Sequence, residues 1–79
     1  MELSFEEKRA RLGLNVTYYR RARNIAQMQL ADKVGVSSCY ISRIECGLKT
    51  VSLRMRMKMA DALETKEAAL INFWKRSVD

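Results

Sequence analysis

A single predicted helix face in this sequence carries small polar side chains and one arginine. Residues 38–46 read as a helix on which Cys39, Ser42, Arg43 and Cys46 share one face. A helix that serves only solubility more often carries Glu and Lys in i, i+4 pairs. Short side chains instead let a helix lie deep in a groove, and an arginine can donate two hydrogen bonds to O6 and N7 of guanine. The pattern therefore predicts recognition of DNA base edges.

The residues that would support catalysis or metal binding are missing. There is no histidine, which is the usual general base and the commonest metal ligand. The two cysteines, Cys39 and Cys46, fit neither a disulfide framework nor a zinc pattern. No acids are paired for chemistry, and no glycine-rich phosphate loop is present. We therefore expect no enzyme, no cofactor and no metal.

The charge balance points to a polyanionic partner. Lysine and arginine number 15 against 9 acids, which gives a net charge of +6. A compact domain this basic attracts nucleic acid first and an anionic membrane second, although ordinary solubilising charge is the alternative. No apolar run approaches the length of a membrane span, and the N-terminus does not resemble a signal peptide. We expect a cytoplasmic protein that does not bind membranes.

The elements that position the polar face are all expected to be helices. Proline is absent and glycines number three, so we expect one all-α domain over residues 1–79. Ser4 with Glu7 predicts a capping box for a first helix that ends at Arg23. Gly13 is unfavourable in a helix interior, so the helix is better supported from Arg11 onward than from Phe5. Residues 1–10 are therefore expected to form an N-terminal extension. Three further helices are expected over 27–34, 52–63 and 64–79, the last best supported over 66–76.

Residues 27–46 have the organisation of a helix-turn-helix. Leu30, Ala31 and Val34 share one face of the first short helix, and Gly35 stands where a helix end favours a left-handed residue. Ser37 is a suitable N-cap for the helix that carries the polar face. In a helix-turn-helix the second helix enters the major groove, while the first crosses the DNA backbone.

The sequence resembles the Xre/Cro-type helix-turn-helix family of phage repressors and bacterial regulators. The resemblance covers residues 11–70 and is densest between Gln27 and Gly47. The residues that carry it are Leu12, Gly13, Val16, Arg20, Gln27, Leu30, Ala31, Gly35, Val36, Ser37, Tyr40, Ile41, Ser42, Arg43, Ile44, Glu45 and Gly47. It implies a compact, five-helix, lambda-repressor-like fold and symmetric dimers that bind two operator half-sites.

The resemblance also implies a role for individual residues. Ser38, Cys39 and Arg43 occupy base-reading positions, and Ser42 shares their face. Gln27 is implied to hold a phosphate and to steady the base-reading side chains, and Lys49 and Thr50 to follow the phosphates. Ser37 and Tyr40 flank the base-reading positions, and we expect them to contact phosphates as well. Arg20 and Glu45 are implied to form a partly buried, structural ion pair.

Three residues depart from the family pattern. Ala26 stands where a serine or threonine usually caps the second helix, and Asn24 replaces a common glycine. Arg56 lies where the family often buries a leucine. Methionines alternate with basic residues over 54–59. Two sets of core-facing residues, one position apart, therefore fit the sequence of this helix. We expect Leu53, Met57, Ala60 and Leu63 to face the core.

The C-terminal residues suggest a contact with a second copy. Phe73 and Trp74 are adjacent, so both cannot point inward from one helix, and an exposed aromatic residue suggests an interface. The sequence thus predicts a homodimeric repressor that binds double-stranded DNA at a palindromic operator. The alternatives are an antitoxin-like domain or a helical interaction domain whose main partner is another protein.

Overall fold

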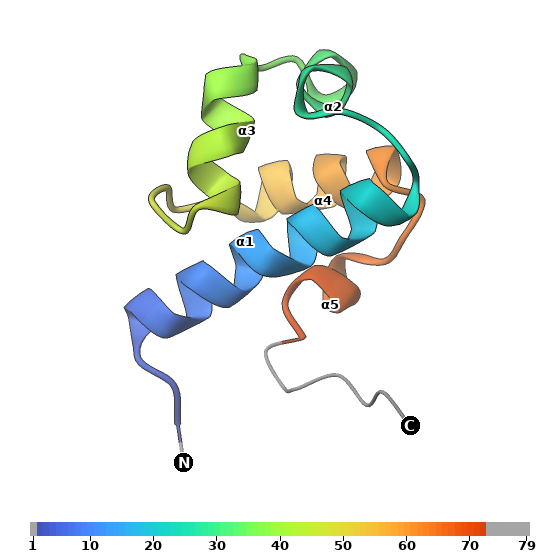
Figure 1. The fold of residues 1–79 in the computed structure, drawn as a ribbon. Helices are drawn as coiled ribbons and strands as arrows, with labels where there is room; N and C mark the ends of the chain where they lie inside the picture. Colours follow the sequence, from blue (N-terminus) through green and yellow to red (C-terminus); the bar gives the residue numbers. More distant parts are fainter. Residues whose placement is uncertain (1, 73–79) are drawn as a thin grey trace.

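The computed structural model describes residues 2–72, which form five helices (Figure 1). These are α1 (Phe5–Ala22), α2 (Gln27–Val34), α3 (Ser38–Glu45), α4 (Leu53–Ala62) and α5 (Glu67–Leu70). No strand occurs in this part of the chain. The expected all-α, five-helix fold is confirmed.

The long helix α1 begins at Phe5 because Ser4 and Glu7 form the expected capping box. The Ser4 hydroxyl accepts from the Glu7 N–H at 3.1 Å, and the Glu7 carboxylate accepts from the Ser4 N–H at 2.8 Å. This exchange satisfies two backbone donors that the helix itself leaves unpaired. The N-terminal extension proposed for residues 1–10 therefore contains the first turns of α1.

The bounds of α2 and α3 agree with the sequence pattern. Gly35 ends α2 in the left-handed conformation, at φ 79°, and the Ser37 side chain accepts from the Tyr40 N–H. Ala26 offers no side-chain cap to α2, as its residue type implies. The Gln29 side chain instead accepts a hydrogen bond from the Ala26 N–H at 2.7 Å. Asn24 adopts a positive φ of 58°, as its replacement of a glycine predicts.

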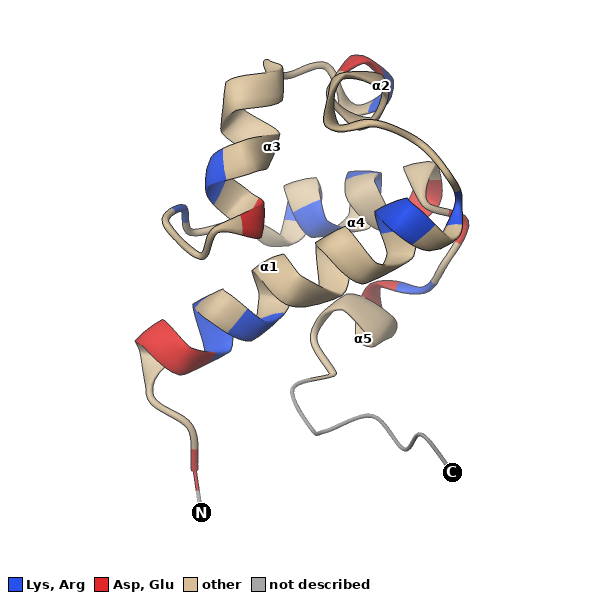
Figure 2. Cartoon of the chain, viewed as in Figure 1, with Lys and Arg blue, Asp and Glu red and all other residues tan. Residues whose placement is uncertain are grey.

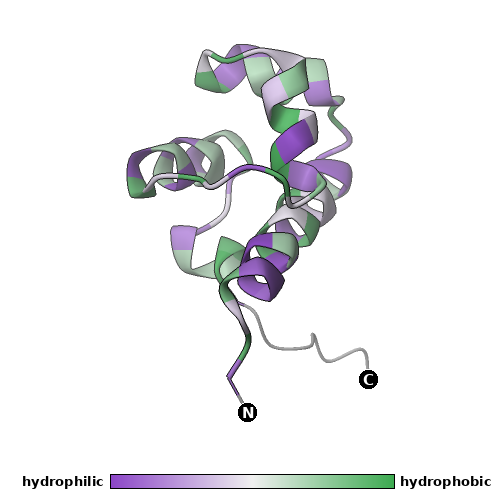
Figure 3. Ribbon diagram, turned by 90° about the vertical axis from the view of Figure 1, so that its left-hand side faces the viewer, coloured by the Kyte–Doolittle hydropathy of each residue, from purple (hydrophilic) through white to green (hydrophobic). Residues whose placement is uncertain are grey.

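The core lies where α1 to α5 meet, with α2 and α3 together on one side of α1 (Figure 1). Each helix contributes apolar residues to this core, and hydrophobic and hydrophilic residues alternate along the ribbon (Figure 3). The buried apolar residues are Leu12, Val16, Leu30, Ala31, Val34, Ile41, Ile44, Val51, Met59, Ala60, Leu63 and Leu70. Burial of these side chains is the main stabilising contribution to the fold.

The facing of α4 differs from the prediction. Leu53 and Met57 are more than half exposed, whereas Met59 is fully buried beside Ala60 and Leu63. Val51 enters the core before the helix, and Ser52 caps it, so the first turn directs Leu53 outward. The expected core positions of Leu53 and Met57 were wrong because methionines at alternate positions make both facings apolar.

The last helix is shorter than predicted. Within the described residues α5 ends at Leu70, although the sequence suggested helix to residue 76. The buried Asn15 side chain donates to the Leu70 carbonyl at 2.8 Å and to the Asn72 carbonyl at 2.9 Å. These bonds satisfy carbonyls that a continuing helix would use, which favours a helix end here. Phe73 and Trp74 lie outside the described residues.

Candidate nucleic-acid interface

The helices α2 and α3 pack at a tight turn, which fixes the direction of the outer face of α3. The N–H groups of Gly35 and Val36 both bond to the Ala31 carbonyl, at 2.8 and 3.0 Å, and close the end of α2. From α3, Ile41 and Ile44 are buried against the core. The opposite face of α3 is therefore turned away from the rest of the protein.

The outer face of α3 presents the four residues predicted to read bases. Cys39 and Arg43 are exposed, while Ser38 and Ser42 are half-buried. Short side chains thus leave the backbone of α3 accessible, and Arg43 extends beyond them. The structure brings these four residues together on one helix. Its shape is that of an element able to enter a groove of DNA.

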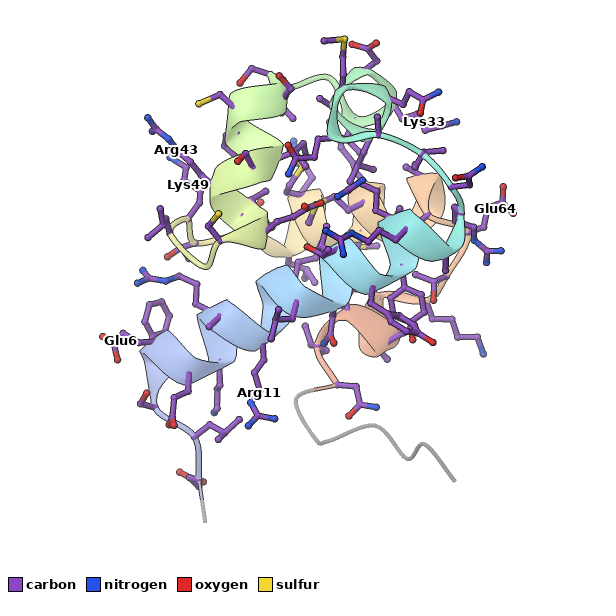
Figure 4. All side chains as sticks on the ribbon, viewed as in Figure 1. Glu6, Arg11, Lys33, Arg43, Lys49 and Glu64 are labelled. Atoms are coloured by element: carbon purple, nitrogen blue, oxygen red, sulfur yellow. The ribbon has the colours of Figure 1, made fainter. Side chains whose placement is uncertain are left out.

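A second cation lies beside Arg43. Lys49, in the loop after α3, and Arg43 project on the same side of the molecule (Figure 4). The Lys49 ammonium lies 5.4 Å from the centre of the Tyr40 ring, which is half-buried against the core. This cation–π contact holds the lysine near α3. Ser37 and Thr50, at the two ends of the same region, are exposed.

Charge is unevenly distributed over this side of the protein. Basic residues lie on α3 and on the loop that follows it, and an acidic residue lies at the end of α3 (Figure 2). Arg43 and Lys49 are exposed, whereas the side chain of Glu45 is paired with Arg20. The side chain of Glu45 is only 6% exposed. The outward surface formed by α3 and its loop is therefore positive, as a surface that approaches phosphates requires.

Arg20 and Glu45 form an ion pair that joins α1 to the end of α3. Arg20 Nε donates to Glu45 Oε2 at 2.6 Å, and a second guanidinium nitrogen reaches Glu45 Oε1 at 3.2 Å. Arg20 also donates to the Ile25 carbonyl, just before α2. One arginine thereby fixes three segments that border the helix-turn-helix.

The Gln27 side chain makes a contact within the protein that the sequence did not predict. Its amide Nε2 donates to Glu45 Oε1 at 2.9 Å. Gln27 thus steadies the acid at the end of α3. Because the amide carries a second hydrogen, a phosphate contact from the same group is compatible with this geometry.

The surroundings of Glu45 lower its pKa. Burial by itself would raise the pKa of Glu45, but hydrogen bonds from Arg20 and Gln27, the charge of Arg20 and the Thr17 hydroxyl outweigh it. The net effect is a pKa below the ordinary value of 4.5. Glu45 is therefore ionised at neutral pH, and the ion pair is intact.

Gly13 permits the close packing of α1 against the end of α3. A Cβ at Gly13 would clash with the Ile44 carbonyl oxygen and lie 2.7 Å from that of Glu45. Gly47 has the same role from the other side, since its Cβ would lie 2.9 Å from Ala10 Cα. The sequence showed a glycine in a helix, but its function depends on a contact between segments that are distant along the chain.

Both cysteines are free and exposed. Residues 2–72 contain no group of three or more His, Cys, Asp or Glu that could hold a metal ion. Among the same residues, no helix is long and apolar enough to cross a membrane.

Comparisons with known proteins agree with this geometry. Residues 16–70 match the family described as Helix-turn-helix. The restriction-modification controller protein C.AhdI from Aeromonas hydrophila superposes with a TM-score of 0.81 and 26% identity, over 86% of this chain and 99% of that one. The comparison with curated proteins gave no match.

Two further solved structures are similar. The clp gene regulator ClgR from Corynebacterium glutamicum has a TM-score of 0.80 and 27% identity, over 84% of this chain and 85% of that one. The hypothetical transcription factor NHTF from Neisseria has a TM-score of 0.78 and 30% identity, over 90% of this chain and 83% of that one. By description these proteins are a controller protein, a gene regulator and a hypothetical transcription factor.

Proposed function

The chain belongs to the Xre/Cro-type helix-turn-helix family of DNA-binding transcription regulators, and we propose that it is a homodimeric repressor of a palindromic operator. The observation that carries the proposal is the exposed, basic outer face of α3. Its inner residues are buried, and its one acid is turned toward α1.

In this proposal α3 lies in the major groove and reads base edges. Arg43 donates to O6 and N7 of a guanine, which is the commonest specific contact of an arginine with DNA. Ser38, Cys39 and Ser42 line the same face and contact neighbouring bases. Their small size supports the proposal because it lets the helix backbone approach the floor of the groove.

Phosphate contacts on both sides of α3 orient it in the groove. Lys49 and Thr50 follow the backbone from the loop after α3, and Ser37 and Tyr40 do so near its start. Gln27 uses its second amide hydrogen for a phosphate at the start of α2. Contacts of this kind fix register and supply affinity that depends on salt, whereas the bases supply sequence preference.

The dimer would place two copies of α3 on one side of the duplex. Two half-sites one helical turn apart, about 34 Å, match the two-fold symmetry of such a dimer. Phe73 and Trp74, outside the described residues, are proposed to make the contact between copies. Repression follows because a bound dimer occludes a promoter, and we propose that this takes place in the cytoplasm.

Selection of bound sequences from random duplex DNA tests this function. We expect an enriched palindrome whose half-sites are separated by one turn, and a Kd for it at least 1,000-fold below that of a scrambled duplex, as is typical of specific binders. Weak binding with no enriched sequence would contradict the proposal and would favour a domain whose main partner is a protein.

A further inference from the structure

A pocket of about 190 Å³ lies between the first half of α1, the loop after α3 and the end of α5. Most of its lining is apolar and comes from Phe5, Leu12, Val51 and Ile71. Apolar cavities of about 150 Å³ accept a benzene molecule. The pocket therefore has room for one aromatic ring with a short polar substituent.

Positive charge borders this apolar lining. Lys8, Arg9 and Arg56 also line the pocket. Arg56 is already paired, since it donates to Glu67 at 3.0 Å and to the Val51 carbonyl at 3.1 Å. Lys8 and Arg9 have no ion pair among the described residues. An occupant of the pocket would therefore meet two uncompensated cations.

Arg9 has a donor that nothing in the described chain accepts. Its Nε is shielded from solvent and has no hydrogen-bond partner. Its guanidinium lies 5.4 Å from the centre of the Phe5 ring, so an aromatic side chain holds it in place. A shielded N–H without a partner costs about 1–3 kcal/mol, and an anion in the pocket would lower that cost.

From these features we propose that the pocket binds a small aromatic carboxylate. The ring would occupy the apolar lining, and the carboxylate would accept hydrogen bonds from the Arg9 guanidinium, near Lys8. A free phosphate fits less well because the pocket is lined mainly by apolar groups, which cannot replace its hydration. The pocket is separate from the base-reading residues of α3, but it shares Thr50, one of the proposed phosphate contacts, with the DNA-binding surface.

The test is a titration of the ¹⁵N-labelled full chain with phenylacetate, without DNA, followed by amide chemical shifts. We expect saturable shifts centred on Leu12, Val51 and Ile71. Acetate lacks the ring and phenylacetamide lacks the charge, so each should bind at least tenfold more weakly. Equal binding of acetate, or shifts that do not saturate, would overturn the proposal.

Variants separate the proposed site from other surfaces. Arg9→Gln should weaken phenylacetate about tenfold or more and leave phenylacetamide unchanged, because only the charged ligand uses the guanidinium. Lys33→Gln, at a separate groove beside α4, is the matched control and should have no effect. If Arg9→Gln fails to fold, Ile71→Trp provides a second test, since it fills the pocket from its exposed rim and should abolish binding.

The C-terminal residues of the chain itself are the competing occupant. The double variant Phe73→Ala and Trp74→Ala, made in the full chain, distinguishes this case. Unchanged affinity for phenylacetate supports the proposal. Binding that occurs only in the double variant would overturn it, because the chain itself would then occupy the pocket. Neither result bears on DNA binding, which is measured separately.

Discussion

Arg43 is the long, exposed side chain on a face of α3 that otherwise carries small residues. An arginine in this position has two possible uses, because it can read a guanine or neutralise a phosphate. The two uses differ in their dependence on sequence and on salt. This difference makes Arg43 the residue on which the proposed mechanism is most easily tested.

We predict that Arg43→Ala weakens binding to the selected site by about 1–3 kcal/mol and relaxes preference at one base pair in each half-site. The dependence of affinity on salt should stay close to that of the wild type, because no phosphate contact is lost. Fluorescence anisotropy over a salt series measures both quantities. Arg11→Ala is the matched control, since Arg11 points away from α3 (Figure 4).

A parallel loss of affinity for every sequence, together with a shallower salt dependence, would make Arg43 a phosphate contact. The same loss in Arg11→Ala would show that net charge is responsible and that the position of the arginine is not.

At the scale of residues, the sequence predicted contacts between residues that are close along the chain but not contacts between distant residues. Ser4, Gly35 and Ser37 were predictable as caps because their partners lie within a few residues. The Arg20–Glu45 ion pair was predicted only from the family resemblance, because its two residues are 25 positions apart in the sequence. The bond from Gln27 to Glu45 was not predicted, because it requires α2 to lie against the end of α3.

At the scale of elements, the contact between α1 and the end of α3 positions the proposed reading helix. Gly13→Ala should destabilise the protein by about 1–3 kcal/mol, because its Cβ would overlap the backbone of Ile44 and Glu45. In an unconstrained helix the same change would stabilise by up to about 1 kcal/mol. Chemical denaturation measures the sign, with Leu14→Ala, on the exposed side of α1, as the control. A stabilised Gly13→Ala would contradict the close packing.

The ion pair is a second link between the same helices. Glu45→Ala should lower the free energy of unfolding by about 3–5 kcal/mol, because Arg20 would lose its partner at a site where its side chain is 11% exposed. Ser42→Ala, on the outer face of α3, should lower the melting temperature far less. Equal melting temperatures for the two variants would contradict a structural role for the pair.

The effect of Glu45→Ala should also depend on pH. Since the folded-state pKa of Glu45 lies below 4.5, its carboxylate stabilises the fold above that pH, and this contribution is lost as the pH falls through the lowered pKa. The difference in stability between wild type and Glu45→Ala should therefore be largest near neutral pH and shrink on acidification. A difference that is constant down to about pH 3 would contradict the lowered pKa.

The elements themselves differ in how well a sequence specifies them. The bounds of α2 and α3 were predictable because glycine and serine mark them and one apolar stripe is available. The facing of α4 was not, because Met55, Met57 and Met59 offer two apolar stripes. The end of α5 could not be predicted either, because it depends on Asn15 in α1, whose side chain donates hydrogen bonds to the carbonyls of Leu70 and Asn72.

At the scale of the whole molecule, the positive charge and the proposed dimer act together. A net charge of +6 attracts the duplex without regard to sequence, and a dimer would double both this charge and the number of reading helices. We predict a homodimer at tens of micromolar in sedimentation equilibrium. Phe73→Ala combined with Trp74→Ala should shift it toward monomer and weaken operator binding.

A chain that sediments only as a monomer at that concentration would remove the basis for a palindromic operator. A dimer unaffected by the double variant would leave the palindrome in place but assign the contact to other residues.

The most direct test of the central claim, that the outer face of α3 reads DNA sequence, is to change the sequence that is read. Selection from random duplexes is carried out in parallel with the wild type and with Arg43→Gln. Glutamine pairs with adenine where arginine pairs with guanine. We predict that one G·C pair in each half-site becomes A·T while the other positions and the spacing remain the same. An identical consensus for the two proteins would contradict the claim.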